Sequence, residues 1–378
     1  RGLIMTLSLR TYQRAAIDGL YEFWGETPGN PLIVIPTGGG KSLVMAAFIR
    51  EVLDVAPAER VLIVTHVREL ISQNFKELLT VWPQAPAGIY SAGLGMRQIG
   101  SQVLFAGIQS IHKRAYDLQR VDLVMVDECH LIPRNSDTMY RRFIGELMQI
   151  NPALKVIGLT ATPYRLDSGR LDDGKGAMFD GIAYEVSVRE LIDEGYLCKL
   201  TTRRTETYLD TSGVAKRGGE FVPGALEAKL DDYEVTKAAV EEIVEAGRDR
   251  RSWLVFGAGI KHCRHIAEEI ERHGYTAACI FGETPKAERD SLIAAYRKGE
   301  IRALVNRDVL TTGFNVPSVD LLAMMRPTMS TGLYVQMVGR GTRNAPGKDN
   351  CLILDFARNI ERHGPVDDPD IRTPGEGD

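Results

Sequence analysis

The sequence predicts an α/β protein of two domains, each built on a parallel β-sheet with helices on both faces. Its 378 residues exceed the roughly 250–300 residues at which a single hydrophobic core usually stops growing. Short apolar runs alternate with amphipathic helical stretches, a pattern typical of strand–helix–strand units, and the pattern occurs twice. We therefore expect a first domain at residues 1–198, a second at 199–360 and a flexible tail at 361–378.

The strand candidates are short apolar runs bounded by turn residues. In the first half they are Leu32–Ile35, Val61–Val64, Val103–Ala106, Leu123–Val126 and Val156–Leu159. In the second half they are Trp253–Phe256, Ala277–Phe281, Arg302–Val305, Val319–Ala323 and Cys351–Asp355. Residues 200–224 between the two sets are polar and contain glycines, so we expect a connector there. From residue 361 the chain is rich in proline, glycine and aspartate and is expected to carry no core.

Composition places the chain among soluble globular proteins. Hydrophobic residues make up 44% and charged residues 25%, close to the averages of that class. No apolar run reaches the ~18–20 residues of a membrane span, so we expect a cytoplasmic protein without membrane contact. The five cysteines are scattered and include no C-x-x-C pair, which favours reduced thiols over disulfides or a zinc ribbon.

A glycine-rich loop follows the first apolar run. Leu32–Ile35 leads into Pro-Thr-Gly-Gly-Gly-Lys-Ser and then into a helical pattern. Glycines allow backbone amides to face a phosphate, and the helix N-terminus adds positive potential. We assign the ATP phosphates to Thr37, Gly38, Gly39, Gly40 and Lys41, and Mg²⁺ to Ser42. The strict phosphate-loop pattern asks for glycine where Ile35 stands, so a glycine-rich turn with a chance lysine is the alternative.

Two carboxylates follow a later apolar run. Leu123–Val126 ends in Asp127 and Glu128. A carboxylate at the carboxyl end of a parallel strand, beside a phosphate loop, can hold Mg²⁺, and the next one can orient the attacking water. We assign Asp127 to Mg²⁺ and Glu128 to the water. Adjacent acids after a strand are otherwise more often a solvated loop, but the preceding phosphate loop favours catalysis.

Four motifs occur in a fixed order along the chain: PTGGGKS, VDECH, LTATP and QMVGRGTR. They resemble motifs I, II, III and VI of superfamily 2 helicases, whose motif I takes this shorter glycine pattern. The resemblance covers about Leu9 to Asp355. It implies two tandem RecA-like domains with the ATP site in the cleft between them, and ATP and Mg²⁺ as cofactors.

Further segments, among them LRTYQ, THVRELISQN and VLTTGFNVPSVDL, are similar to RadD-like bacterial DNA-repair helicases and their phage relatives. Known RadD-type proteins extend into a cysteine-rich zinc-binding region, and none is visible in this sequence. The resemblance implies a DNA helicase or translocase acting in repair or recombination, with repair proteins as possible partners.

The resemblance also implies roles for single residues. Gln13 would read the adenine, Thr160 and Thr162 would couple the nucleotide to domain movement, and His130 would face Gln336 across the cleft. Asn315 stands where the family usually has aspartate, at a position expected to contact the nucleotide sugar or to order the cleft.

Two arginines, Arg340 and Arg343, are three residues apart, which would place both guanidinium groups on one face of a helix. The resemblance makes them a pair of arginine fingers that stabilise the charge on the transferring phosphoryl group. The alternative is that the two arginines lie on a solvent-exposed helix and have no catalytic role.

Nucleic-acid contacts are expected from loops that follow strands, because the net charge of −4 and the pI near 6.1 give no bulk attraction. Hydroxyls, amides and helix N-termini hold phosphates without reading bases. The candidates are Thr65, His66, Arg68, Gln109 and Ser110 in the first domain, and Thr311 and Thr312 in the second. Ordinary strand-to-helix turns are the alternative for each short stretch.

The leading hypothesis is an ATP-dependent DNA helicase or translocase, expected to be monomeric. An RNA helicase is the nearest rival, since the DNA preference comes from the resemblance alone. A clamp that binds ATP and nucleic acid with weak hydrolysis is a third possibility, which Asn315 keeps open. The sequence gives neither polarity nor substrate structure.

Overall fold

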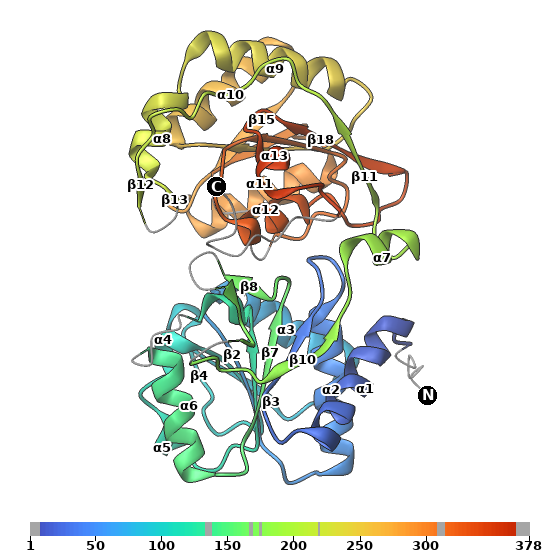
Figure 1. Ribbon diagram of the computed structural model, residues 1–378, viewed down its shortest axis with the longest axis vertical. Helices are drawn as coiled ribbons and strands as arrows, with labels where there is room; N and C mark the ends of the chain where they lie inside the picture. Colours follow the sequence, from blue (N-terminus) through green and yellow to red (C-terminus); the bar gives the residue numbers. More distant parts are fainter. Residues whose placement is uncertain are drawn as a thin grey trace. The chain divides into compact units, whose positions relative to one another are not determined.

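The computed structural model describes residues 8–132, 138–165, 169–173, 176–217, 220–307 and 314–367. The chain divides into two compact units, Arg1–Val186 and Ser187–Asp378, and each is a mixed α/β unit, as predicted (Figure 1). Within the described residues, no helix is both long and apolar enough to cross a membrane.

The first unit is built on an eight-stranded sheet in the order β10-β1-β7-β6-β2-β5-β3-β4. Its strands are β1 (Pro31–Val34), β2 (Val61–Thr65), β3 (Ala87–Ser91), β4 (Met96–Arg97), β5 (Val103–Gly107), β6 (Leu123–Asp127), β7 (Lys155–Thr160) and β10 (Gly181–Glu185). All described pairings in this sheet are parallel except β3 with β4. The central strands are buried along their whole length, as expected for a parallel sheet with both faces covered.

Helices cover both faces of this sheet (Figure 1). The helices α1 (Thr11–Glu26), α2 (Lys41–Val55) and α3 (Arg68–Val81) pack against one another on one face. The short helices α4 (Ile108–Ile111) and α5 (Ala115–Leu118) and the longer α6 (Met139–Ile150) bury Ile108, Leu118 and Phe143 in a core on the other face. A separate two-stranded ribbon joins β8 (Tyr164–Arg165) to β9 (Gly169–Arg170).

The second unit is built on a six-stranded sheet in the order β11-β18-β17-β14-β16-β15, and all of its described pairings are parallel. Its strands are β11 (Lys199–Arg203), β14 (Trp253–Gly257), β15 (Ala277–Ile280), β16 (Ala303–Asn306), β17 (Leu321–Met325) and β18 (Asn350–Asp355). Alternate residues of β14 enter two different cores: Trp253 and Val255 one, Leu254 and Phe256 the other. This alternation shows that helices bury both faces.

The helices of the second unit divide between these two cores. The first core takes side chains from α8 (Pro223–Leu230), α9 (Tyr233–Gly247) and α10 (Ile260–Arg272), and the second from α11 (Lys286–Lys298) and α12 (Thr331–Val338). The remaining elements are α7 (Val188–Asp193), the hairpin of β12 (Lys216–Arg217) with β13 (Glu220–Phe221), and α13 (Asn359–His363).

Each predicted apolar run overlaps a strand of the structure, whereas β3, β4 and the six strands from β8 to β13 were not predicted. The division between the units precedes Ser187, whereas the sequence suggested a boundary after Cys198, so residues 187–198 lie in the second unit. The physical reason is pairing: the backbone N–H of Cys198 donates to the carbonyl of Thr342 at 2.6 Å, and β11 pairs with β18.

The expectation that the chain carries no core from residue 361 is wrong for residues 361–367. His363 and Val366 are buried, at 3% and 7% exposure. His363 Nε2 lies 2.9 Å from the carbonyl oxygen of Thr328, and the Tyr334 hydroxyl donates to the carbonyl of Gly364 at 3.1 Å. Residues 361–367 are thus packed into the second unit, and the rest of the predicted tail lies outside the described residues.

Candidate functional site

The loop between β1 and α2 has the conformation that its glycines predict. Gly38 and Gly40 have φ angles of 89° and 81°, in the left-handed region that favours glycine. The φ of Gly40 would strain any other residue, and a Cβ atom there would lie 2.6 Å from Gln13 Nε2, so Gln13 would have to move. Gly40 directly precedes α2, which places the loop amides at the N-terminus of a 15-residue helix. The loop can therefore hold an anion.

Lys41, the first residue of α2, forms a buried ion pair with Glu128. Lys41 Nζ lies 2.8 Å from Glu128 Oε1, and the two side chains are only 11% and 13% exposed. Burial by itself would lower the pKa of Lys41, but the charges of Glu128 and Asp127 outweigh it and raise the pKa. Glu128 has a φ of 52°, a strained conformation for a residue other than glycine.

Asp127 lies at the end of β6 and is 4% exposed. Burial raises the pKa of its carboxyl, as does the charge of Glu128, while Lys41 and a hydrogen bond from Asn74 act in the opposite direction. Asn74 Nδ2 donates to Asp127 Oδ2 at 2.7 Å, and Asn74 Oδ1 lies 2.7 Å from the hydroxyl of Ser42. The two predicted Mg²⁺ ligands are thus linked through one amide. Asn74 was not predicted as a site residue, although it ends the segment THVRELISQN and is a polar residue on an otherwise apolar helix face.

Gln13 lies against the phosphate loop. It is 2% exposed; its Oε1 accepts the backbone N–H of Arg10 at 3.0 Å, and its Nε2 lies 3.4 Å from the carbonyl oxygen of Gly39. Tyr12, which was not predicted, donates its hydroxyl to the same carbonyl at 2.6 Å. The start of α1 therefore fixes the loop from outside, and the adenine contact assigned to Gln13 stays a prediction.

His130 connects the acid pair to the end of β7. Its Nδ1 lies 3.0 Å from Thr160 Oγ1 and 3.3 Å from Glu128 Oε2. The hydroxyl of Thr160 donates to the carbonyl of Thr162 at 2.8 Å and accepts the Thr162 N–H at 3.1 Å. The three predicted coupling residues therefore form one network with Glu128. The pairing of His130 with Gln336, which lies on α12, stays a prediction.

The loops after β2 and β5 meet at the same edge of the sheet. Gln109 Nε2 donates to the carbonyl of His66 at 3.4 Å, and Ser110 Oγ accepts the N–H of Ala92 at 2.9 Å. Arg68 begins α3 and is exposed. Burial lowers the pKa of His66, whose ring stacks on Tyr140 with centroids 6.1 Å apart.

Thr65 differs from its neighbours because it is only 1% exposed. Its hydroxyl accepts the N–H of Val67 at 3.3 Å, so the side chain shapes the turn and does not face solvent. Thr311 and Thr312, assigned to the second unit's half of the groove, lie outside the described residues.

The predicted arginine pair does not lie on a helix. α12 ends at Val338, so Arg340 and Arg343 follow it, and the one-turn spacing argument is wrong. The two side chains still converge, because both donate through Nη1 to the carbonyl oxygen of Phe314, at 2.7 and 3.1 Å. The shared carbonyl oxygen of Phe314, and not a common helix face, brings the two guanidinium groups together.

Asn315 is the side-chain partner of Arg343. Its Oδ1 accepts a hydrogen bond from Arg343 Nη1 at 2.7 Å. Burial lowers the pKa of Arg343 to about 10. The amide oxygen therefore holds a partly desolvated cation without neutralising it.

Lys348 fixes the backbone around this pair and was not predicted. Its Nζ donates to the carbonyl oxygens of Arg343 at 2.7 Å, Gly341 at 2.8 Å and Pro317 at 3.2 Å. Burial lowers the pKa of Lys348. One ammonium group thus joins the segment that carries Arg343 to the segment that carries Asn315.

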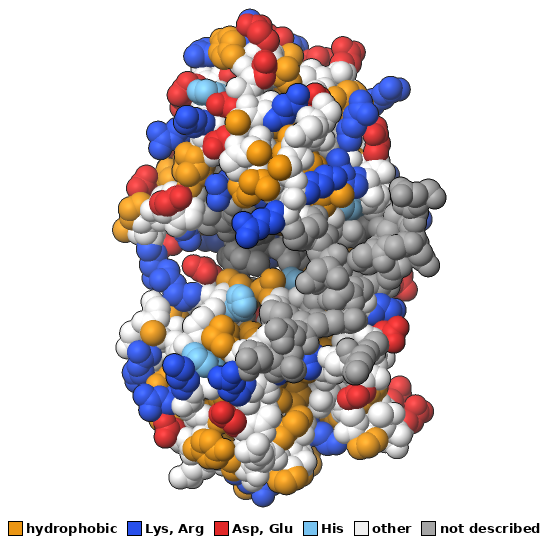
Figure 2. Space-filling model, turned by 60° about the vertical axis from the view of Figure 1, so that its left-hand side comes forward, with side chains coloured by type: hydrophobic (Ala, Val, Ile, Leu, Met, Phe, Trp, Pro, Cys, Tyr) orange, Lys and Arg blue, Asp and Glu red, His pale blue; other side chains and the backbone are white. Residues whose placement is uncertain are grey.

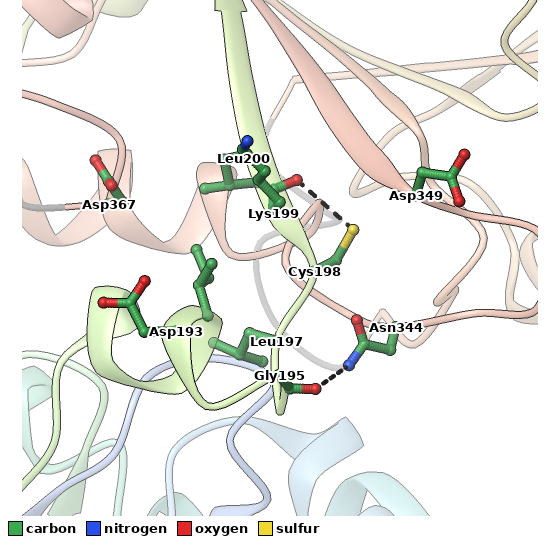
Figure 3. Close-up of a pocket in the computed structure, with 10 residues that line it drawn as sticks. Asp193, Gly195, Leu197, Cys198, Lys199, Leu200, Asn344, Asp349 and Asp367 are labelled. Atoms are coloured by element: carbon green, nitrogen blue, oxygen red, sulfur yellow. Dashed lines mark hydrogen bonds between the residues drawn. The ribbon is translucent and has the colours of Figure 1, made fainter.

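A polar hollow of about 530 Å³ lies beside the arginine segment (Figure 3). It lies between the end of α7, the start of β11 and the loop before β18. Asn344 Nδ2 donates to the carbonyl of Gly195 at 3.0 Å across this hollow. The residue that directly follows Arg343 is thereby tied to the chain that leads into β11.

Two family descriptions match the chain. Residues 6–165 match "Type III restriction enzyme, res subunit", and residues 235–345 match "Helicase conserved C-terminal domain". A Saccharomyces cerevisiae protein named as an ATP-dependent helicase, IRC3, is 28% identical over 92% of this chain, which spans only 51% of that protein's length. The "DNA 3'-5' translocase XPB2" of Sulfurisphaera tokodaii is 25% identical over 92% of this chain and 81% of its own length.

Solved structures share the fold. A Type ISP restriction-modification enzyme, LlaBIII, bound to DNA, has a TM-score of 0.68 at 14% identity, over 93% of this chain and 28% of that one. The Saccharomyces cerevisiae protein Dbp5, bound to RNA and ADP BeF3, has a TM-score of 0.60 at 15% identity, over 93% of this chain and 85% of that one.

The Lys348 contacts predict a specific loss of stability. We expect Lys348→Met to destabilise the second unit by about 1–3 kcal/mol, because three carbonyl oxygens lose a charged donor. Denaturant unfolding measures this, and amide exchange at residues 314–318 should accelerate. The control is Lys298→Met, whose 70% exposed side chain pairs with Glu300 and should matter by less than about 0.5 kcal/mol. Equal effects of the two substitutions would contradict the assignment.

Proposed function

Because the chain belongs to the DExH-type superfamily 2 helicases, we propose that it is an ATP-dependent DNA helicase or translocase. The observation that carries this proposal is the buried cluster at the carboxyl edge of the first unit's sheet. There the phosphate loop, Lys41, the acid pair and His130 are joined by direct contacts.

The residues of this cluster fit ATP and Mg²⁺. The left-handed glycines leave the loop open to phosphates, and Lys41 supplies a point charge at the helix N-terminus. Ser42 and Asp127 offer oxygen atoms, the ligands that Mg²⁺ prefers, linked by one amide. Mg²⁺ held there would neutralise charge on the phosphate oxygens.

The ion pair between Lys41 and Glu128 suggests how the site is set for hydrolysis. A triphosphate in the loop offers Lys41 a stronger anionic partner than a single carboxylate. The ion pair between Lys41 and Glu128 then breaks. The Glu128 carboxylate becomes available to orient the attacking water or to accept a proton from it. His130 Nδ1 lies 3.3 Å from Glu128 Oε2 and 3.0 Å from Thr160 Oγ1. A movement of the Glu128 carboxylate would therefore be transmitted through His130 to Thr160.

The second unit would supply the cations for the transition state. In the proposed cycle Arg340 and Arg343 exchange the carbonyl oxygen of Phe314 for the phosphoryl group when nucleic acid favours the closed protein. Such arginines contribute roughly 10³–10⁵ in rate in other phosphoryl-transfer enzymes.

The nucleic-acid contacts would be to phosphates. In the first unit His66 follows β2, Arg68 begins α3 and Gln109 lies on the short helix α4. All three are at one edge of the sheet and offer donors without base-reading geometry. On the face drawn in Figure 2, basic and acidic side chains of the described residues are interspersed. With a net charge of −4 as well, nucleic acid would be bound through local contacts and not through bulk attraction.

DNA is the proposed substrate because relatives such as XPB2 are named for DNA translocation, whereas the fold is shared with a DNA-bound and an RNA-bound protein. A role in repair or recombination follows the same resemblance. The monomeric state, the cytoplasmic location, the repair partners and the closeness to RadD-like proteins stay predictions from the sequence.

The first test is ATP hydrolysis measured with single-stranded, duplex and forked DNA and with RNA of equal length. We expect DNA to raise the rate at least several-fold, because a bound strand favours the state in which the arginines act. Greater stimulation by RNA would support the RNA helicase alternative. A rate that no nucleic acid changes would remove the motor function.

A second test separates binding from chemistry at Glu128. We expect Glu128→Gln to keep or improve ATP binding, because Lys41 loses its competing carboxylate, and to lower turnover at least roughly 100-fold, since the water loses its base. Nucleotide affinity and single-turnover hydrolysis are both measured. Lys41→Met, which should lose affinity, is the contrasting variant. Loss of ATP binding in the Gln form would show that Glu128 has another role.

A third test concerns Asn315. We expect Asn315→Asp to tighten ATP binding or to raise turnover several-fold, because a carboxylate would pair with the Arg343 cation more strongly than the present amide oxygen does, by about 1 kcal/mol, and so order Arg343. Asn315→Ala removes the acceptor and should act in the opposite direction. Equal or poorer values for the Asp form would mean that the amide already does all that this position requires.

A further inference from the structure

We propose that Asn74 is a positioning residue that presets Ser42 and Asp127 as a pair of oxygen ligands for a divalent cation. The inference rests on the proposed function, because that function puts nucleotide and Mg²⁺ at this site. Asn74 lies on α3, is 2% exposed, and contacts both side chains at 2.7 Å.

The chemistry of the partners fixes which way the amide points. Asp127 is a carboxylate and only accepts, so the atom that faces its Oδ2 must be the donor, Nδ2. The carbonyl oxygen, Oδ1, then faces Ser42. Because a carbonyl oxygen only accepts, the Ser42 hydroxyl must donate its single hydrogen to Asn74.

This arrangement leaves lone pairs on both predicted ligands as acceptors for a cation. The Ser42 hydroxyl donates its hydrogen to Asn74, so the lone pairs of its oxygen stay available as acceptors. Asp127 accepts one N–H on each oxygen, from Asn74 on Oδ2 and from the backbone of Glu128 on Oδ1 at 3.0 Å. Each carboxylate oxygen retains a further acceptor site. Without Asn74 the hydroxyl could donate to a carboxylate, and the spacing of the two oxygens would no longer be fixed.

Packing alone does not explain an asparagine at this position. Its helix buries the apolar residues Leu70, Ile71 and Leu78, and a leucine would suit such a face better. A buried amide is tolerated only when its donors and acceptors are paired, and here the partners are the two predicted metal ligands. Groups that orient metal ligands in this way typically change metal affinity roughly 10–100-fold when they are replaced.

The experiment measures binding of a fluorescent ADP analogue with EDTA and across a Mg²⁺ titration. Asn74→Leu removes both hydrogen bonds at a similar side-chain volume, and Asn74→Ala removes them without adding bulk or charge. We expect both variants to bind the analogue in EDTA within about twofold of the wild type, and to need about 10-fold or more Mg²⁺ for half-saturation. Manganese, monitored by its own spin resonance, gives a second readout that does not depend on hydrolysis.

Asn151→Leu is the matched control, because Asn151 is also buried in the first unit but bonds to Val121 and Asp122, away from the site. It should lower thermal stability without moving the Mg²⁺ requirement. Folded Asn74 variants with the Mg²⁺ requirement of the wild type would overturn the role of Asn74 alone. A wild-type protein whose nucleotide binding ignores Mg²⁺ would overturn the proposed function and this inference together.

Discussion

The buried ion pair between Lys41 and Glu128 is the interaction on which the first unit's site depends. Removing two charges from water costs several kcal/mol for each ion, and only close contact and further hydrogen bonds repay it. The pair meets at 2.8 Å, with His130 beside the other carboxylate oxygen. It joins the start of α2 to the turn after β6, and Glu128 reaches it from a strained left-handed conformation. Any anion that enters the loop must compete with this carboxylate for Lys41.

The polar residues around the pair come from separate elements and meet because the sheet is parallel. The carboxyl ends of β1, β6 and β7 lie at one edge, where ligands of open α/β sheets bind. Tyr12 from α1 and Asn74 from α3 close the cluster from outside the sheet. The site is thus supported by helices on rigid strands, which suits a cluster that must keep its geometry while its charge partners change.

In the second unit, the cations of Arg343 and Lys348 are hydrogen-bonded to neutral oxygen atoms. Arg343 bonds to the carbonyl of Phe314 and the amide of Asn315, and Lys348 bonds to three carbonyls. Neutral acceptors pair with a cation more weakly than carboxylates do, so the charges of Arg343 and Lys348 are solvated by these oxygen atoms and not neutralised. Burial nevertheless lowers the pKa values of Arg343 and Lys348, which reflects the missing counter-charge.

The sequence by itself determined the two α/β halves, the strands that carry the site, the phosphate loop and the acid pair. These features depend on apolar runs and on residues adjacent in the chain, and local patterns record both. Only the tertiary structure decided the partners: Asn74 meets Asp127 across 53 residues of sequence. It also placed the arginines beyond α12 and buried Val366 in a segment expected to be free of the core. Such contacts are set by how strands and helices pack over long sequence separations, which a local pattern does not contain.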